Sequence, residues 1–230
     1  MTTWRIVLVG LAMLVLLFHV GCSEESKERY HFRMTVEVET PQGLRTGSSV
    51  YEVSAWRPVI RDAIDRAWSV RGEAVAVDLP GGKTLFALLK TNAMHNDMAG
   101  LSMTALDPAF NNDIIESATR IAARRGIRSP AEVPRSDYPM LVTFRDPKDP
   151  KSVERVTSDD LSATFGVGVK LKRITVRVAN DAVTTGIEKR LAWLETHIGS
   201  LVKRERNRPI GDMPEEHRLT VTNFKMGTPK

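Results

Sequence analysis

Cysteine and aromatic residues are scarce in this sequence. Its 230 residues include one cysteine, and aromatic residues make up 6% of the chain. A single cysteine cannot form a disulfide within one chain, which excludes a disulfide-stapled fold. No HExxH motif, no CxxC pair and no acidic calcium loop occurs, so the sequence predicts no metal site and no cofactor. The GxSxG motif of serine hydrolases is also missing.

The chain also lacks an apolar run long enough for a membrane-spanning helix. Its longest run, from Ile6 to Val20, has about 15 residues and follows Arg5, whereas a helix needs about 20 to cross a bilayer. A short apolar run after a basic start is typical of a secretory signal. Gly21 supplies the small residue that a signal peptidase requires, and Cys22 follows it. We therefore expect residues 1–21 to be a signal peptide.

The stretch Phe18-His19-Val20-Gly21-Cys22 resembles a bacterial lipobox, although His19 stands where the lipobox usually has Leu. The resemblance implies a lipoprotein of the bacterial cell envelope. Cys22 would carry palmitate, which inserts into the membrane lipid and anchors the protein. Ser23, directly after the cysteine, implies transport to the outer membrane, facing the periplasm. The alternatives are an ordinary secretory signal that is cut nearby and an uncleaved anchor.

Residues 22–29 are polar and are expected to form a tether, with residues 30–230 as one domain. The net charge of +5 falls to +4 without the signal, because Arg5 is the only charged residue among residues 1–21. This mild basic excess is compatible with an envelope protein or a glycan as partner. Nucleic acid is excluded as a partner by export and by the lack of an aromatic and basic recognition motif.

Most of the domain has the pattern of antiparallel strands joined by tight turns. Apolar and polar residues alternate from Phe32 to Val38, which is typical of a half-buried strand. Residues 80–83, Pro-Gly-Gly-Lys, predict a hairpin turn, and the apolar run 85–89 predicts a central strand that is buried on both faces. The expected strands are residues 32–38, 48–56, 73–79, 84–90, 140–144, 167–178 and 218–224.

The run 167–178 changes its parity. Val167, Val169 and Leu171 share one face of a regular strand, whereas Ile174 and the apolar residues after it fall on the other. A β-bulge near Lys172 and Arg173 would bring all of them to the same face, because it adds one residue to the strand. A break into two strands is the alternative.

Four segments have helical patterns. A helix over 114–122 begins after a capping residue among 111–113 and ends at Gly126. Thr185 and Glu188 have the spacing of a capping box, ahead of apolar residues in steps of three and four. The expected helices are residues 59–67, 114–122, 158–165 and 185–198, the last being the best defined. Together these elements predict an α+β fold: a single domain, mainly antiparallel sheet, with three to four short helices.

One expected loop, His95-Asn96-Asp97, places an imidazole beside a carboxylate. Together with Ser48 or Ser49 it would supply the nucleophile, base and orienting group of an envelope hydrolase. A polar loop without catalysis explains the same residues. The leading hypothesis is therefore a non-enzymatic binding or interaction module with no catalytic residue, and the hydrolase is the alternative.

Two further stretches carry a family resemblance. Residues 160–166 and 183–194, together with the hairpin at Gly81, resemble motifs of an uncharacterised family of proteobacterial exported envelope proteins. The resemblance implies an exported single domain. It implies no activity, no catalytic residue and no cofactor.

Overall fold

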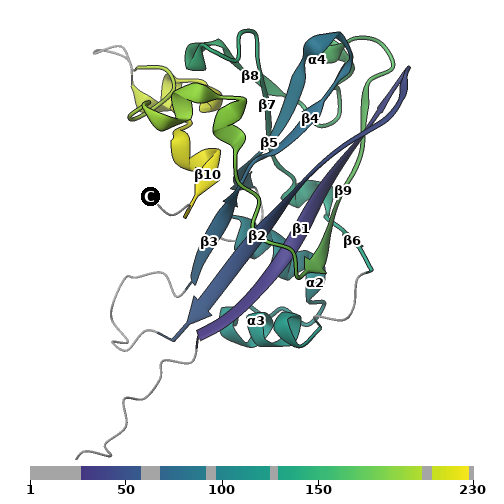
Figure 1. Ribbon diagram of the computed structural model, residues 1–230, viewed down its shortest axis with the longest axis vertical. Helices are drawn as coiled ribbons and strands as arrows, with labels where there is room; N and C mark the ends of the chain where they lie inside the picture. The colour runs from purple at the N-terminus through teal and green to yellow at the C-terminus, as the bar shows by residue number, and fades with distance from the viewer. Residues whose placement is uncertain (1–26, 58–67, 92–96, 125–128, 204–208, 228–230) are drawn as a thin grey trace, which may run out of the picture.

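The computed structural model of the chain shows two antiparallel sheets with three short α-helices in its described part (Figure 1). The described residues are 27–57, 68–91, 97–124, 129–203 and 209–227. The strands are β1 (Lys27–Thr40), β2 (Gly43–Trp56), β3 (Trp68–Glu73), β4 (Val75–Asp78), β5 (Thr84–Thr91), β6 (Ala131–Glu132), β7 (Pro139–Phe144), β8 (Val153–Val156), β9 (Lys170–Ala179) and β10 (Lys225–Met226). The α-helices are α2 (Met98–Leu106), α3 (Ile114–Ala123) and α4 (Ser162–Phe165). The predicted α+β character is confirmed.

The larger sheet has the order β10-β3-β2-β1-β9-β6 and is built on the long hairpin of β1 and β2. Its strands pair from Lys27 and Trp56 at one end to Thr40 and Gly43 at the other. Alternate residues of β1, such as Phe32, are fully buried, while those between them are half-buried or exposed. The alternation in the sequence thus correctly predicted a strand with one face in the core.

The smaller sheet has the order β4-β5-β7-β8 and packs on the buried face of the larger one. The chain passes between the sheets at Ala74, between β3 and β4. A Cβ atom on Gly47 of β2 would lie 2.1 Å from the carbonyl oxygen of Ala76, so the two strands can cross this closely only at a glycine. Residues 85–89 of β5 are all buried, which confirms the predicted central strand.

The helices α2 and α3 cover another part of the same face of the larger sheet. The Tyr30 hydroxyl of β1 hydrogen-bonds with Ser102 of α2 at 2.7 Å, and α3 packs on β1 and β2. In Figure 1 both helices lie at the end where β1 begins, and the smaller sheet lies towards the opposite end. None of the helices in the described ranges is both long and apolar enough to cross a membrane.

Strand β9 contains the predicted bulge. Glu37 of β1 pairs with Arg173, but the next residue, Val38, pairs with Leu171, so Lys172 is the extra residue. Leu171 and Ile174 are both buried, although they would fall on opposite faces of a regular strand. The bulge therefore keeps Leu171 and Ile174 on the same buried face. The prediction was wrong for Val167, which precedes β9 and is exposed.

The predicted helix over 185–198 is wrong. Two short 3₁₀ helices, Ile187–Lys189 and Ala192–Glu195, occupy this segment. Gly186 has φ +109° and precedes the first of them without a side-chain cap, so the Thr185 capping box does not form. The segment is held by contacts with distant residues instead, including the hydrogen bond from the Trp193 indole to the carbonyl of Pro147.

The predicted strand over 218–224 is also wrong. Thr220 and Asn223 form a capping box around the 3₁₀ helix Val221–Asn223, and such local bonds compete with strand pairing. Only Lys225 and Met226 pair with β3. Sequence patterns missed β3, β6, β8 and α2, while the predicted helix over 59–67 lies outside the described residues. The remaining 3₁₀ helices are Pro80–Gly82, Arg135–Asp137, Pro150–Ser152, Ile210–Asp212 and Glu215–Arg218.

Candidate functional site

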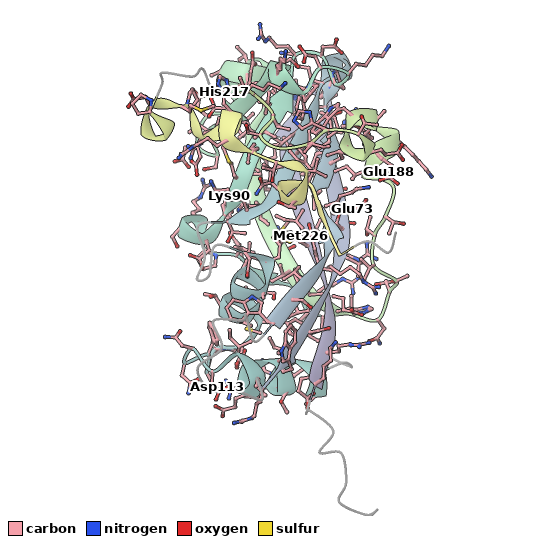
Figure 2. The ribbon with its side chains drawn as sticks, turned by 90° about the vertical axis from the view of Figure 1, so that its left-hand side faces the viewer. Glu73, Lys90, Asp113, Glu188, His217 and Met226 are labelled. Carbon is pink, nitrogen blue, oxygen red and sulfur yellow. The ribbon has the colours of Figure 1, made fainter. Side chains whose placement is uncertain are left out.

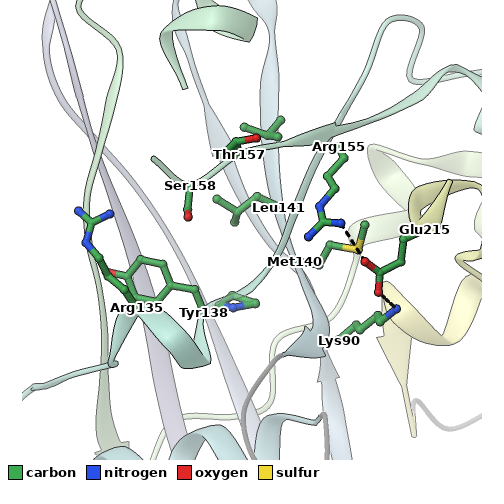
Figure 3. A pocket seen from close by; sticks show the side chains of 11 residues that line it. Lys90, Arg135, Tyr138, Met140, Leu141, Arg155, Thr157, Ser158 and Glu215 are labelled. Carbon is green, nitrogen blue, oxygen red and sulfur yellow. Dashed lines mark hydrogen bonds and ion pairs between the residues drawn. The ribbon is translucent and has the colours of Figure 1, made fainter. Parts of the chain in front are cut away.

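A polar cleft of about 190 Å³ opens at one end of the smaller sheet. Its walls come from the end of β5, the start of β7 and the end of β8, together with two 3₁₀ helices. Met140 and Leu141 of β7 contribute its apolar part, and Ser158 adds a hydroxyl group. Figure 3 shows Lys90, Arg155 and Glu215 meeting on one side of the cleft, with Arg135 and Tyr138 on the other side.

One wall of the cleft is held together by Glu215. Its carboxylate forms ion pairs with Lys90, through Oε1, and with Arg155, through Oε2 at 2.9 Å (Figure 3). The hydrogen bond from Lys90 lowers the pKa of Glu215, with further lowering by the charges of Lys90, Arg155 and Arg218 that outweighs the effect of burial. Glu215 therefore stays ionised at neutral pH and ties the C-terminal segment to β5 and β8.

The opposite wall carries a third cation, Arg135. Its guanidinium lies 2.8 Å from Asp159 and 5.9 Å from the centre of the Tyr138 ring, a cation–π distance. Burial raises the pKa of Tyr138, so its hydroxyl is neutral at physiological pH. Lys90 and Arg155 thus share one carboxylate, Glu215, while Arg135 is paired with Asp159.

This arrangement suits the binding of an oxyanion. Guanidinium groups keep their charge at physiological pH and donate several hydrogen bonds in a fixed fork, which matches carboxylate and phosphate oxygens. The cleft has two such groups, on Arg135 and Arg155.

Asp97, from the predicted catalytic loop, caps a helix. Its Oδ1 accepts hydrogen bonds from the backbone N–H groups of Ala99 and Gly100 at 2.9 and 3.0 Å, at the start of α2. Its Oδ2 accepts another from the Trp68 indole at 2.8 Å. Capping of this kind accounts for a buried Asp at this position. His95 lies outside the described residues.

The two candidate nucleophiles have structural partners as well. The Ser48 hydroxyl accepts a hydrogen bond from Arg33 at 3.0 Å, and the Ser49 hydroxyl faces the carbonyl of Ala74 at 3.4 Å. Trp68, the partner of Asp97, pairs with Ala55 of β2. Ala55 is six residues from Ser49, about 20 Å along an extended strand. The structure therefore does not bring Asp97 together with either serine.

Cys22, the predicted lipid attachment site, lies outside the described residues. Strand β1 begins at Lys27, five residues after Cys22 and inside the range 22–29 expected as a tether. No group of three or more His, Cys, Asp and Glu side chains in the described part of the chain is placed to hold a metal ion.

Sequence patterns missed the cleft residues. Lys90, Arg135, Arg155 and Glu215 are spread over 126 positions of the chain and share no motif. A comparison with known proteins finds no matching family model, no similar curated protein and no similar solved structure. The family resemblance of residues 160–166 and 183–194 therefore stays a prediction.

Proposed function

We propose that this chain is a lipid-anchored protein of the bacterial envelope that binds an oxyanion group of an envelope partner, without catalysing a reaction. The supporting observation is that Lys90, Arg135 and Arg155 line one cleft. The bound group would be a carboxylate or a phosphate carried by an envelope protein or a glycan. At about 190 Å³, the cleft holds such a group and its first few neighbouring atoms, because drug-sized ligands need about 300 Å³ or more.

The lipid anchor in this proposal rests on the sequence around Cys22. Acylation there would place the folded part close to the membrane, because only four residues lie between Cys22 and the first strand. Several acyl chains on one residue hold a protein on a membrane far more firmly than one chain does. In this proposal the protein faces the periplasm from the outer membrane.

Binding is tested by titrating the full chain, purified in detergent, with inorganic phosphate and with succinate at constant ionic strength. We expect saturable heats in isothermal calorimetry. Arg155→Gln should weaken binding about tenfold, the value of a hydrogen bond to a charged group. The matched control is Arg145→Gln, which removes an exposed arginine paired with Glu154 at the other end of β7 and β8. Equal affinity of the wild type and Arg155→Gln would contradict the proposal.

The anchor is tested by growing cells with a clickable fatty acid. We expect the wild type to carry the label and Cys22→Ala to lose it, while Ser23→Ala keeps it because the acyl chains sit on the cysteine. Equal labelling of the wild type and Cys22→Ala would remove the lipid anchor from the proposal and would leave the oxyanion site to be judged by its own titration.

A further inference from the structure

A buried carboxyl group lies where the chain crosses from the larger to the smaller sheet. Glu73 is the last residue of β3, and only 2% of its surface is exposed. Its Oε2 accepts a hydrogen bond from the backbone N–H of Ile187 at 2.8 Å. In Figure 2, Glu73 lies in the middle part of the molecule, at a distance from Asp113 near one end.

The second carboxyl oxygen, Oε1, is buried and has no hydrogen-bond partner among the described residues. An unsatisfied buried acceptor costs about 1–3 kcal/mol, and such groups are rare in folded proteins without a ligand, an ion or water to satisfy them. Burial raises the pKa of the nearby Tyr51 hydroxyl, the Ser49 hydroxyl opposes this rise, and the charge of Glu73 adds to it. The crossing point thus has unused hydrogen-bonding capacity.

Glu73 also lines a cavity of about 190 Å³ between the crossing point and the segment 184–187. The hydroxyl-bearing residues Ser48, Ser49 and Thr185 line the same cavity. Hydroxyl oxygens accept hydrogen bonds as readily as they donate them. The cavity therefore offers several acceptors around one carboxylate.

The charges near Glu73 leave its own charge unmatched. Arg190, which also lines the cavity, is paired with Asp78 through two bonds of 2.6 and 2.8 Å. Lys225 is paired with Glu188 at 3.5 Å. Burial raises the pKa of Glu73, and the backbone N–H groups of Ile187 and Gly186 oppose this rise. The charge of Glu188 raises the pKa further, whereas the charge of Lys225 lowers it. A positively charged donor would thus complement this cavity.

We infer that the Glu73 cavity is a second binding site, which takes a primary ammonium group. An ammonium donates three hydrogen bonds and accepts none, which matches a carboxylate with one oxygen unpartnered in the described part of the chain and a cavity that hydroxyl-bearing residues line. The volume of about 190 Å³ is well above that of a single water site and admits an ammonium on a narrow alkyl stem. This site shares no lining residue with the oxyanion cleft, so the inference stands apart from the proposed function.

The test is a titration of the ¹⁵N-labelled full chain in detergent with n-butylammonium, followed by NMR. The amide of Ile187 reports on the site because it donates to Glu73. We expect a saturable shift of this amide with n-butylammonium and none with n-butanol, which has a similar shape but no charge. Glu73→Gln preserves the acceptor for Ile187 and should weaken binding at least tenfold.

The matched control is Glu195→Gln, which removes an exposed carboxylate eight residues after Ile187. This variant should keep the affinity for n-butylammonium within twofold of the wild type. Equal binding by Glu73→Gln, or no saturable shift, would overturn the inference and would mean that water alone satisfies Oε1. Nα-acetyl-lysine methylamide and D-glucosamine distinguish a protein source from a sugar source, since the true ligand should saturate the same Ile187 shift at the lower concentration.

Discussion

Two of the buried carboxyl groups, Asp107 and Glu73, have pKa values shifted in opposite directions. Burial by itself would raise the pKa of Asp107, but hydrogen bonds from Arg120 and from the backbone N–H of Ala109 help to lower it overall. For Glu73 burial prevails. The difference follows from the partners, because Asp107 faces a guanidinium with both oxygens and Glu73 has one oxygen with no hydrogen-bond partner in the described part of the chain.

Asp107→Asn should destabilise the protein by about 3 kcal/mol, since it leaves Arg120 without its buried partner between α2 and α3. The control is Glu116→Gln, which removes the exposed partner of Arg120 and should cost less than about 1 kcal/mol. Urea denaturation measures both. Because the pKa of Asp107 is lowered, its contribution is present above the ordinary value of 3.8 and disappears as the pH falls below it. If the difference in the free energy of unfolding between the wild type and Asp107→Asn grew as the pH fell, this account would be contradicted.

Glu73→Gln should show the opposite pH dependence. Because the pKa of Glu73 is raised in the folded state, the wild type has its full stability below the ordinary pKa of 4.5. It loses part of this stability as the pH rises through the folded-state pKa and Glu73 ionises. The glutamine side chain does not ionise, so the variant does not lose stability over this pH range. We therefore expect the variant to gain stability relative to the wild type between pH 4 and pH 8, by about 1–3 kcal/mol, the cost of an unsatisfied buried group. Urea titrations at both pH values decide the sign, and a relative loss would show that Glu73 has a partner when ionised.

At the scale of secondary-structure elements, the crossing of β2 and β4 depends on one glycine. Gly47→Ala should destabilise the protein by more than about 2 kcal/mol, because its Cβ would lie 2.1 Å from the Ala76 carbonyl and the strands would have to separate. Gly211→Ala meets no atom within 4 Å and should change the stability by less than about 0.5 kcal/mol. Thermal unfolding of both variants measures the difference. Similar melting temperatures would mean that the two strands do not need this close approach.

The elements that the sequence predicted well are those whose pattern reflects their own surroundings. The alternation in β1, the turn before β5 and the Asp113 cap of α3 each depend on neighbours within a few residues. The bulge in β9 could be predicted for the same reason, because its change of parity is visible along one strand. Residues 187–198 have a helical pattern as well, but their partners come from distant parts of the chain.

At the scale of the whole molecule, Glu215 connects the C-terminal segment to the smaller sheet and also competes with any anion in the cleft. Glu215→Gln should bind phosphate about five to ten times more tightly, because an ion pair of this exposure is worth about 1 kcal/mol. Calorimetry at constant ionic strength measures the change, with Glu216→Gln, on the same 3₁₀ helix, as the control. Weaker binding by Glu215→Gln would mean that the carboxylate positions Lys90 and Arg155 for the anion.

The candidate sites could not be predicted from the sequence, because each joins residues that are far apart along the chain. Glu73 and Ile187 are separated by 114 positions, and no spacing rule relates them. The predicted His95 and Asp97 loop followed from proximity in sequence. In the structure Asp97 caps α2 instead, a role that the sequence also permitted, since an Asp ahead of a helix is a common cap.

The sequence by itself determined the alternation of strands, the turns, the helix at 114–123 and the bulge of β9, because apolar periodicity and turn chemistry act over a few residues. It also carries the prediction of an anchor at Cys22. Only the tertiary structure decided the paths of residues 187–203 and 209–226 and the positions of the oxyanion cleft and of Glu73. In those places contacts across the chain outweigh local preference, since buried polar groups must find their partners wherever the fold brings them.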